Sequence, residues 1–268
     1  SYCLRPDPED PAVQEAFRAG RVKHFTRYTG LTYPALSTPE DVLAEVAAKA
    51  EQLRANGAAR LALKTGAFGM PDLALAIRVA SELDFELLTI DGSGGGTGMS
   101  PNDMLDNWGV PSVLLHAKAH DYAFLRAAAG KRVVDLAVGG GLAKPSQAFK
   151  ALALGAPYVS AVGLCRSSMA AAMSAKKIGE LIEAGKVPPE LARFGTTKEE
   201  LFSDLPELRG LYGSAADGFS TGAVGVYSYL NRIAYGLRHF AALNRKFDVK
   251  HIERRDVFPL TRDAKELL

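Results

Sequence analysis

The chain has 268 residues, 47% of them hydrophobic, which is enough to bury the core of one or two domains. Its 32 basic and 30 acidic residues give a net charge of +2. That balance argues against nucleic acid or an anionic membrane surface as a partner. No apolar stretch reaches the roughly 20 residues of a membrane-spanning helix, so no membrane insertion is expected.

Cysteine is rare and widely spaced. Cys3 and Cys165 form no metal-spaced set. They predict no disulfide framework, no metal site and a reducing, cytoplasmic location. Cys165, within the segment VGLCRSS, is expected to be a small buried residue.

The elements begin with a proline-rich segment, residues 1–38, which predicts a loop-rich lead-in. A helix is predicted over 39–54, because the STPED segment at 37–41 combines an N-cap hydroxyl, a proline in the first turn and acidic side chains. Four strand–helix units follow. Their strands are predicted at 60–65, 85–91, 132–138 and 157–162, and their helices at about 71–83, 112–129, from 145 onward and at 166–184.

Repeated strand–helix units with glycine-containing turns predict a parallel sheet, in a barrel or a doubly wound fold. Periodicity does not separate the two. After residue 185 the pattern changes to a mixed segment with short helices. A long amphipathic helix is predicted over 222–244, followed by an ordered, partly extended tail.

Two glycine-rich strand ends predict a phosphate site. GGGL at 139–142 follows the third strand, and Gly163 follows the fourth. Backbone amides of Gly140, Gly141 and Gly163 can approach a phosphate closely, and Arg166 adds a positive charge. The last two strands of a (βα)8 barrel are the usual place for such a site.

The loop DGSGGGTGMSP at 91–101 follows the second strand and contains five glycines. Its backbone can approach a flat ligand, and its hydroxyls can donate hydrogen bonds. Ser93, Gly95, Gly96 and Thr97 are therefore candidate substrate contacts. The spacing fits neither a Walker A loop nor a dinucleotide fingerprint.

Lys64, in LALKTG at the end of the first strand, is the candidate catalytic residue, because its ammonium can reach an anionic substrate or a flavin carbonyl. The alternative is a lysine that only carries its charge to solvent. His116 and His120 are four residues apart on a predicted helix, but no third ligand is spaced to complete a metal site with them.

In this order, STPEDV, ALKTG, the GGTG-x-SP loop, GGGL and the Gly163 turn resemble the FMN-binding domain of the glutamate synthase family, over roughly 25–260. The long helix after 222 and the IERRD segment add to the resemblance. It implies the C-terminal half of an FMN-binding (βα)8 TIM barrel at 39–184, with a helical extension at 185–268 packing on the barrel. It also implies FMN-dependent reduction of an imine, which in the family yields glutamate from 2-oxoglutarate.

By this resemblance Lys64 is the active-site lysine, and Gly140, Gly141 and Gly163 are the FMN-phosphate glycines. Ser93 and Gly94 stand where the family usually has His and Asp. The family's iron–sulfur cysteines are missing after the last strand, so no cluster is expected in this chain. The nitrogen source is then free ammonia, another amine or a partner subunit.

Two other interpretations remain open at this stage. The same phosphate turns suit a lyase or isomerase that uses Lys64 as a Schiff-base nucleophile. A non-catalytic half-barrel subunit is the third possibility. Four strands do not close a barrel. An N-terminal half-barrel, a partner chain or a homo-oligomer is therefore expected to complete it around a small α-oxo acid or amino acid.

Overall fold

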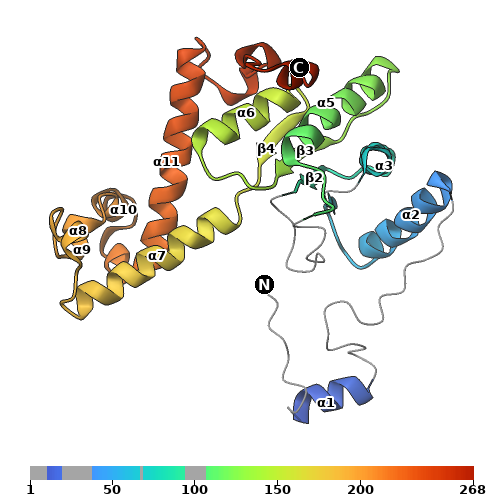
Figure 1. The fold of residues 1–268 in the computed structure, drawn as a ribbon. Helices are drawn as coiled ribbons and strands as arrows, with labels where there is room; N and C mark the ends of the chain where they lie inside the picture. The colour runs from blue at the N-terminus through green and yellow to red at the C-terminus, as the bar shows by residue number, and fades with distance from the viewer. Residues whose placement is uncertain (1–10, 20–37, 67–68, 94–106) are drawn as a thin grey trace. The chain divides into compact units, whose positions relative to one another are not determined.

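The computed structural model describes residues 11–19, 38–66, 69–93 and 107–268 (Figure 1). The chain divides into two compact units. The first comprises Ser1–Gly141, Tyr158–Ala161 and Leu260–Leu268, and the second comprises Leu142–Pro157 and Val162–Pro259.

The first unit is built on a four-stranded sheet in the order β1-β2-β3-β4, in which β1 pairs with β2 and β2 with β3 in parallel. The strands are β1 (Ala62–Thr65), β2 (Leu87–Asp91), β3 (Asp135–Gly139) and β4 (Val159–Val162). The helices are α1 (Pro11–Arg18), α2 (Pro39–Ala55), α3 (Met70–Glu82), α5 (Ser112–Ala128) and α12 (Arg262–Glu266). The expected βα alternation and parallel sheet are confirmed.

Helix α2 begins where the STPED segment predicts. The Thr38 hydroxyl accepts a hydrogen bond from the Asp41 amide at 3.1 Å, and the Asp41 carboxylate accepts one from the Thr38 amide at 2.9 Å. The two residues thereby satisfy backbone donors at the helix start that would otherwise lack a partner.

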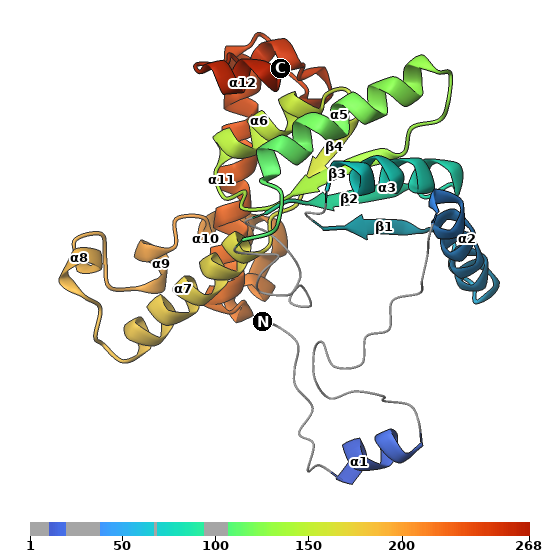
Figure 2. The same cartoon turned by 45° about the vertical axis from the view of Figure 1, so that its right-hand side comes forward.

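Only one face of the sheet is well buried. Leu88, Ile90, Leu136 and Val138 point to that face and are fully buried. Helices α3 and α5 both lie on this side of the sheet (Figure 2). The opposite face is more open, since Ala62, Lys64, Asp135 and Ser160 are exposed. Parallel sheets normally have both faces covered, so the open second face is unusual for a sheet of this kind.

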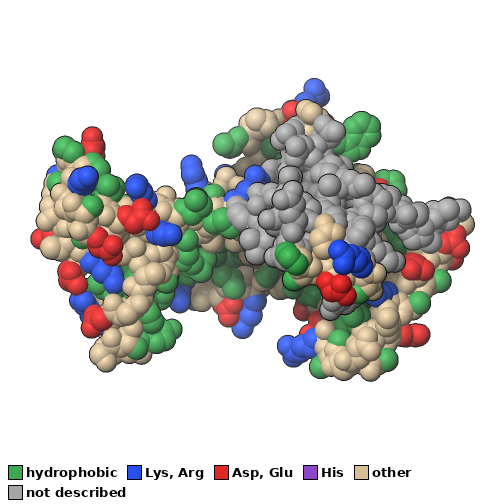
Figure 3. All heavy atoms as spheres, turned by 90° about the horizontal axis from the view of Figure 1, so that it is seen from below, with side chains coloured by type: hydrophobic (Ala, Val, Ile, Leu, Met, Phe, Trp, Pro, Cys, Tyr) green, Lys and Arg blue, Asp and Glu red, His purple; other side chains and the backbone are tan. Residues whose placement is uncertain are grey.

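The second unit is helical. Its elements are α6 (Pro145–Gly155), α7 (Arg166–Glu183), α8 (Pro189–Ala192), α9 (Lys198–Leu201), α10 (Leu205–Tyr212), η1 (Gly213–Gly218), α11 (Thr221–Leu243), η2 (Val249–His251) and η3 (Arg254–Asp256). Its core gathers apolar side chains of α7, α10 and α11 around Phe202 and Leu205. In Figure 3, acidic and basic side chains are interspersed on the face in view.

Small residues allow α7 and α11 to pack closely. A Cβ atom added at Gly225 would lie 2.2 Å from the Cβ of Ala175 and 2.9 Å from the carbonyl oxygen of Ala171. One added at Gly179 would lie 2.3 Å from the Thr221 hydroxyl. The two helix backbones therefore approach at positions where neither carries a large side chain.

Two local expectations were wrong, and a third is met in part. Helix α1 lies inside the lead-in expected to be irregular, because Pro11 occupies its first position, where proline is tolerated. The tail was expected to be ordered and partly extended, and in it the short helices η2, η3 and α12 alternate with segments that are not helical. The Lys246 ammonium lies 2.7 Å from the Asp256 carboxylate and folds this segment back. Cys165 is exposed rather than buried, since it lies at the N-cap of α7.

Candidate functional site

The site is best described in the first unit, at the carboxyl ends of β1, β2 and β3. Lys64 lies on β1 opposite Thr89 of β2, and Asp91 lies two residues further along β2. Because side chains alternate along a strand, Lys64 and Asp91 share one face of the sheet. Lys64 Nζ lies 3.0 Å from Oδ2 of Asp91. The Lys64 side chain is 46% exposed and that of Asp91 13%.

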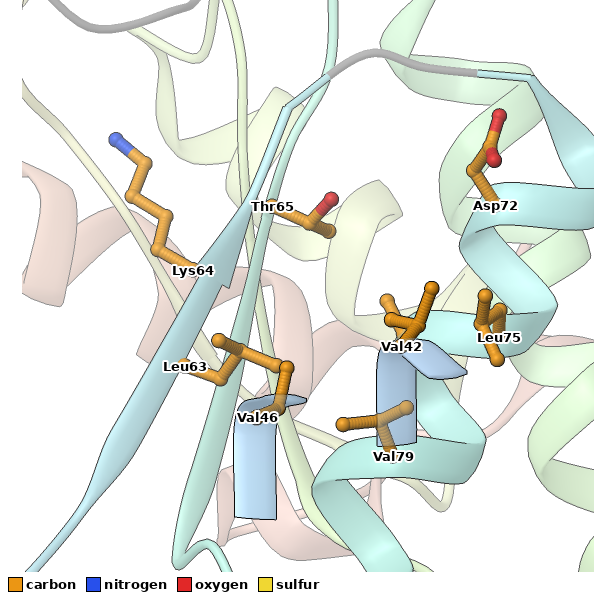
Figure 4. Close-up of a pocket in the computed structure, with 9 residues that line it drawn as sticks. Val42, Val46, Leu63, Lys64, Thr65, Asp72, Leu75 and Val79 are labelled. Atoms are coloured by element: carbon orange, nitrogen blue, oxygen red, sulfur yellow. The ribbon is translucent and has the colours of Figure 1, made fainter. Parts of the chain in front are cut away.

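Lys64 faces away from the helices. A pocket of about 260 Å³ lies between α2, β1 and α3 (Figure 4). It is lined by Val42, Val46, Leu63, Leu75, Ala76 and Val79, together with Lys64, Thr65 and Asp72. The Lys64 ammonium points to the other side of β1 in this view. The pocket therefore lies on the helix side of the strand, and the ammonium lies on the side that bears Asp91.

The segment after β2 is tied to the start of α5. Ser93 forms an isolated bridge with Pro111, and its amide donates to the carbonyl of Val110 at 2.9 Å. Its carbonyl oxygen accepts from the Ser112 hydroxyl at 2.8 Å. Ser93 thus stands at the beginning of the predicted substrate loop. The other candidates in that loop, Gly95, Gly96 and Thr97, lie outside the described residues.

The turn after β3 adopts a backbone that favours glycine. Gly140 has φ of 112° and Gly141 has φ of 72°. The amides of Gly141 and Leu142 have no hydrogen-bond partner among the residues that the structure describes. These donors are available to an anion. The carbonyl of Gly140, in contrast, accepts from the Ser112 hydroxyl at 2.8 Å.

The predicted partners of this turn lie at the end of β4. Gly163 and Arg166 are both exposed, and Arg166 opens helix α7, whose first turn has no side-chain cap. Strands β3 and β4 are neighbours in the sheet. Gly163 and Arg166 belong to the second compact unit, whereas Gly140 and Gly141 belong to the first.

The chain matches one protein family. Residues 21–176, more than half of the chain, match the family model described as the conserved region in glutamate synthase. The chain belongs to that family. The matched segment contains all four strands and ends within α7. No individual curated protein matches the chain.

The expected resemblance to glutamate synthase is therefore confirmed. Membership indicates a role of the glutamate synthase family and an oxidoreductase activity. Within the described residues, no helix is long and apolar enough to span a bilayer. The same part of the chain holds no group of three or more His, Cys, Asp or Glu side chains arranged for a metal ion.

His116 is a residue of this site that sequence reasoning did not assign. It is buried on α5, and its Nε2 lies 3.1 Å from the carbonyl oxygen of Gly139. Because a carbonyl can only accept, Nε2 carries the proton in this hydrogen bond. Burial lowers the pKa of the imidazole, and the Gly139 carbonyl and the charge of Asp91 oppose that shift. The side chain is held as a neutral donor.

Sequence reasoning also missed Asp91 and Ser112. Asp91 comes from β2, and only the register of the sheet places it beside Lys64. Ser112 follows Pro111 at the start of α5, which is an ordinary helix-opening pattern. Its position one turn before His116 was the signal available, because residues four apart lie on one face of a helix.

Proposed function

We propose that this member of the glutamate synthase family is an FMN-dependent oxidoreductase. It reduces an imine, formed from an α-oxo acid and ammonia or an amine, to the amino acid. By family resemblance the product is glutamate and the oxo acid is 2-oxoglutarate. The observation that carries the proposal is the Lys64 ammonium beside Asp91, at the same strand ends as the amides of Gly141 and Leu142.

The residues present fit the phosphate of FMN. Two successive glycines with positive φ follow β3, and the amides of Gly141 and Leu142 lack partners among the described residues. Unpartnered amides at a strand end suit a phosphate. Gly140 and Gly141 are the residues of the first unit that we expect to hold it. A contribution from Gly163 and Arg166 stays a prediction from the sequence. Reduced FMN, when bound, supplies the hydride that converts the imine to the amine.

Lys64 is proposed to bind the carboxylate of the oxo acid. Its ammonium lies on the open face of the sheet and remains partly exposed, so a substrate anion can approach it. Asp91 holds the ammonium in place before the substrate arrives. Ser93, Gly95, Gly96 and Thr97 remain the proposed loop contacts to the rest of the substrate.

The Schiff-base alternative is less well supported. Nucleophilic attack needs an unengaged amine, whereas Lys64 Nζ lies 3.0 Å from Oδ2 of Asp91 in an ion pair. A charged lysine at this position suits the binding of an anion. The non-catalytic alternative assigns no role to the Lys64–Asp91 ion pair.

The open face of the sheet also bears on partners. Ala62, Lys64, Asp135 and Ser160 are exposed on it. In a (βα)8 barrel this face is the interior, filled by side chains from all eight strands. We propose that further βα units of the same kind cover it. Light scattering of the purified chain tests this: a homo-oligomer identifies a second copy as their source, and a monomer with this face protected from hydrogen exchange contradicts the proposal.

The activity is tested with the full chain loaded with FMN and reduced without oxygen. Adding 2-oxoglutarate and ammonia together should reoxidise the flavin and yield glutamate, and either compound alone should not. Lys64→Gln should raise the concentration of oxo acid needed, and Lys150→Gln, at an exposed position on α6, is the control. Absence of flavin binding, or no reoxidation across a series of α-oxo acids and amines, would overturn the proposal.

A further inference from the structure

We infer that Ser112 and His116 are positioning residues that fix the turn after β3 against the segment after β2, and that they thereby set the affinity of this turn for the FMN phosphate. The inference rests on the proposed function for the identity of the ligand. The positioning itself rests on hydrogen bonds within the first compact unit.

Ser112 connects two chain segments with one hydroxyl. Its Oγ lies 2.8 Å from the carbonyl oxygen of Ser93 and 2.8 Å from that of Gly140. A serine hydroxyl has a single proton, and neither carbonyl can supply another. The two oxygens therefore share one donor. Any movement of one segment changes the hydrogen bond available to the other.

The surroundings of this hydroxyl leave no room for adjustment. A Cβ atom added at Gly92 would lie 2.4 Å from Ser112 Oγ, and one added at Gly140 would lie 2.3 Å from it. Both glycines are therefore required by the serine itself. The ends of β2 and β3 lie so close to Ser112 that the residues there, Gly92 and Gly140, have no space for a side chain.

His116 holds the preceding peptide. Its Nε2 donates to the carbonyl of Gly139 at 3.1 Å, and the amide of Gly92 donates to the same oxygen at 3.0 Å. A carbonyl oxygen has two lone pairs, so the Gly139 acceptor is fully used. The carbonyls of Gly139 and Gly140 are thus both held from helix α5.

Fixing a carbonyl fixes the next amide. In a planar trans peptide the C=O of one residue and the N–H of the following residue point in opposite directions. The Gly140 carbonyl is directed at Ser112, so the Gly141 N–H is directed away from it. That amide has no partner among the described residues, and φ of Gly141 is 72°. Ser112 accordingly orients a donor that no described residue occupies, as a phosphate site needs.

The test compares two flavins that differ only in the phosphate. Dissociation constants for FMN and riboflavin are measured by flavin fluorescence in the full chain. Ser112→Ala should weaken FMN binding about tenfold, as expected for loss of one positioned hydrogen bond, and leave riboflavin binding unchanged. His116→Leu should act in the same direction. His116→Gln should restore FMN binding, since its amide can donate to Gly139.

Ser81 offers a matched control. Its hydroxyl is buried, donates to Ile77 at 2.6 Å and accepts from the Val134 amide at 3.1 Å, before the start of β3. Ser81→Ala should cost stability without changing the ratio of FMN to riboflavin affinity. An equal loss of that ratio in Ser81→Ala and Ser112→Ala would overturn the inference, as would an unchanged ratio in Ser112→Ala.

A second measurement separates this inference from the proposed function. The amides of Gly92 and Ser93 donate to Gly139 and Val110. Their hydrogen exchange in flavin-free protein should be faster in Ser112→Ala than in Ser81→Ala, and equal exchange would overturn the positioning role. If the unmodified chain binds riboflavin as tightly as FMN, or binds neither, the proposed phosphate site is wrong and the inference about affinity fails with it.

Discussion

Gly140 is the position at which packing and phosphate binding are most easily confused. Its backbone has φ of 112°, and an added Cβ would lie 2.3 Å from Ser112 Oγ and 2.6 Å from the Gly92 carbonyl oxygen. Gly140→Ala should therefore destabilise the protein even without flavin. Gly130 is the matched control: it also has positive φ, of 68°, but an added Cβ meets nothing within 4 Å.

The two variants share one penalty and differ in another. An alanine with positive φ costs about 1–2 kcal/mol at Gly130, whose φ of 68° lies in the left-handed region, and at least as much at Gly140, whose φ of 112° lies outside it. Gly140→Ala must also displace a backbone oxygen, and overpacking of this kind typically costs about 1–3 kcal/mol more. We therefore expect the free energy of unfolding to be about 1–3 kcal/mol lower for Gly140→Ala than for Gly130→Ala.

Denaturant unfolding of the flavin-free chain measures this difference. Equal midpoints and slopes for the two variants would refute the packing argument. The result also decides how flavin binding should be interpreted. If Gly140→Ala is selectively destabilised, a loss of FMN in that variant does not report on a phosphate contact. A substitution at Gly141, whose amide is unpartnered among the described residues, is then the informative one.

Three further predictions concern stability. Burial lowers the pKa of His116, so below about pH 6.5 the unfolded state binds more protons than the folded state. The free energy of unfolding should therefore fall as the pH drops below about 6.5. Unfolding of His116→Gln measured against pH should show a shallower fall of this free energy. Gly225→Ala should lower the thermal midpoint of unfolding, because the added methyl group would clash with Ala175 and Ala171 where α7 and α11 pack closely. Gly210→Ala is the control and should raise or preserve the midpoint, since an added Cβ there meets nothing within 4 Å. Asp256→Asn should destabilise the C-terminal turns by about 1–3 kcal/mol, because Lys246 loses a partner at 2.7 Å; an unchanged denaturation midpoint would contradict this.

Most of the element order follows from local pattern. Helix α5 was predicted over 112–129 and spans Ser112–Ala128, and β2 was predicted over 85–91 and spans Leu87–Asp91. These segments have strong periodicity and clear glycine or proline boundaries, so neighbouring residues determine them. The first residues of the strands are predicted less well, because each apolar segment begins before the residues that form backbone hydrogen bonds in the sheet.

The tail could not be predicted in the same way. Its turns depend on Lys246, which is ten residues from Asp256 and also pairs with Glu253 at 3.3 Å. The Arg254 guanidinium also donates a hydrogen bond to the carbonyl of Leu154 at 3.2 Å. These contacts join residues that no local pattern relates. Helix α11 is a similar case, since it was predicted to be amphipathic and yet Leu230 on it is exposed.

The same limit applies to the site. Lys64 was identified because a lysine at the end of a strand can reach an anionic substrate or a flavin carbonyl. Asp91 was missed because only sheet register brings it within 3.0 Å. Ser93 was chosen as a hydroxyl donor, yet in the described structure its backbone makes the connection to Ser112. The type of a side chain indicated where chemistry could occur, but its hydrogen-bond partners could be identified only from the folded structure.

The glycines of the GGGL motif have different roles, so each must be interpreted separately. Gly140 lacks a side chain because Ser112 and Gly92 occupy the space. The Gly141 amide has no partner among the described residues, and its orientation follows from the Gly140 carbonyl, which accepts from the Ser112 hydroxyl. One glycine therefore serves the protein's own packing, and that packing presents the amide of the next. A phosphate site built in this way depends on a helix residue 28 positions earlier in the chain, which a search limited to the motif would not include.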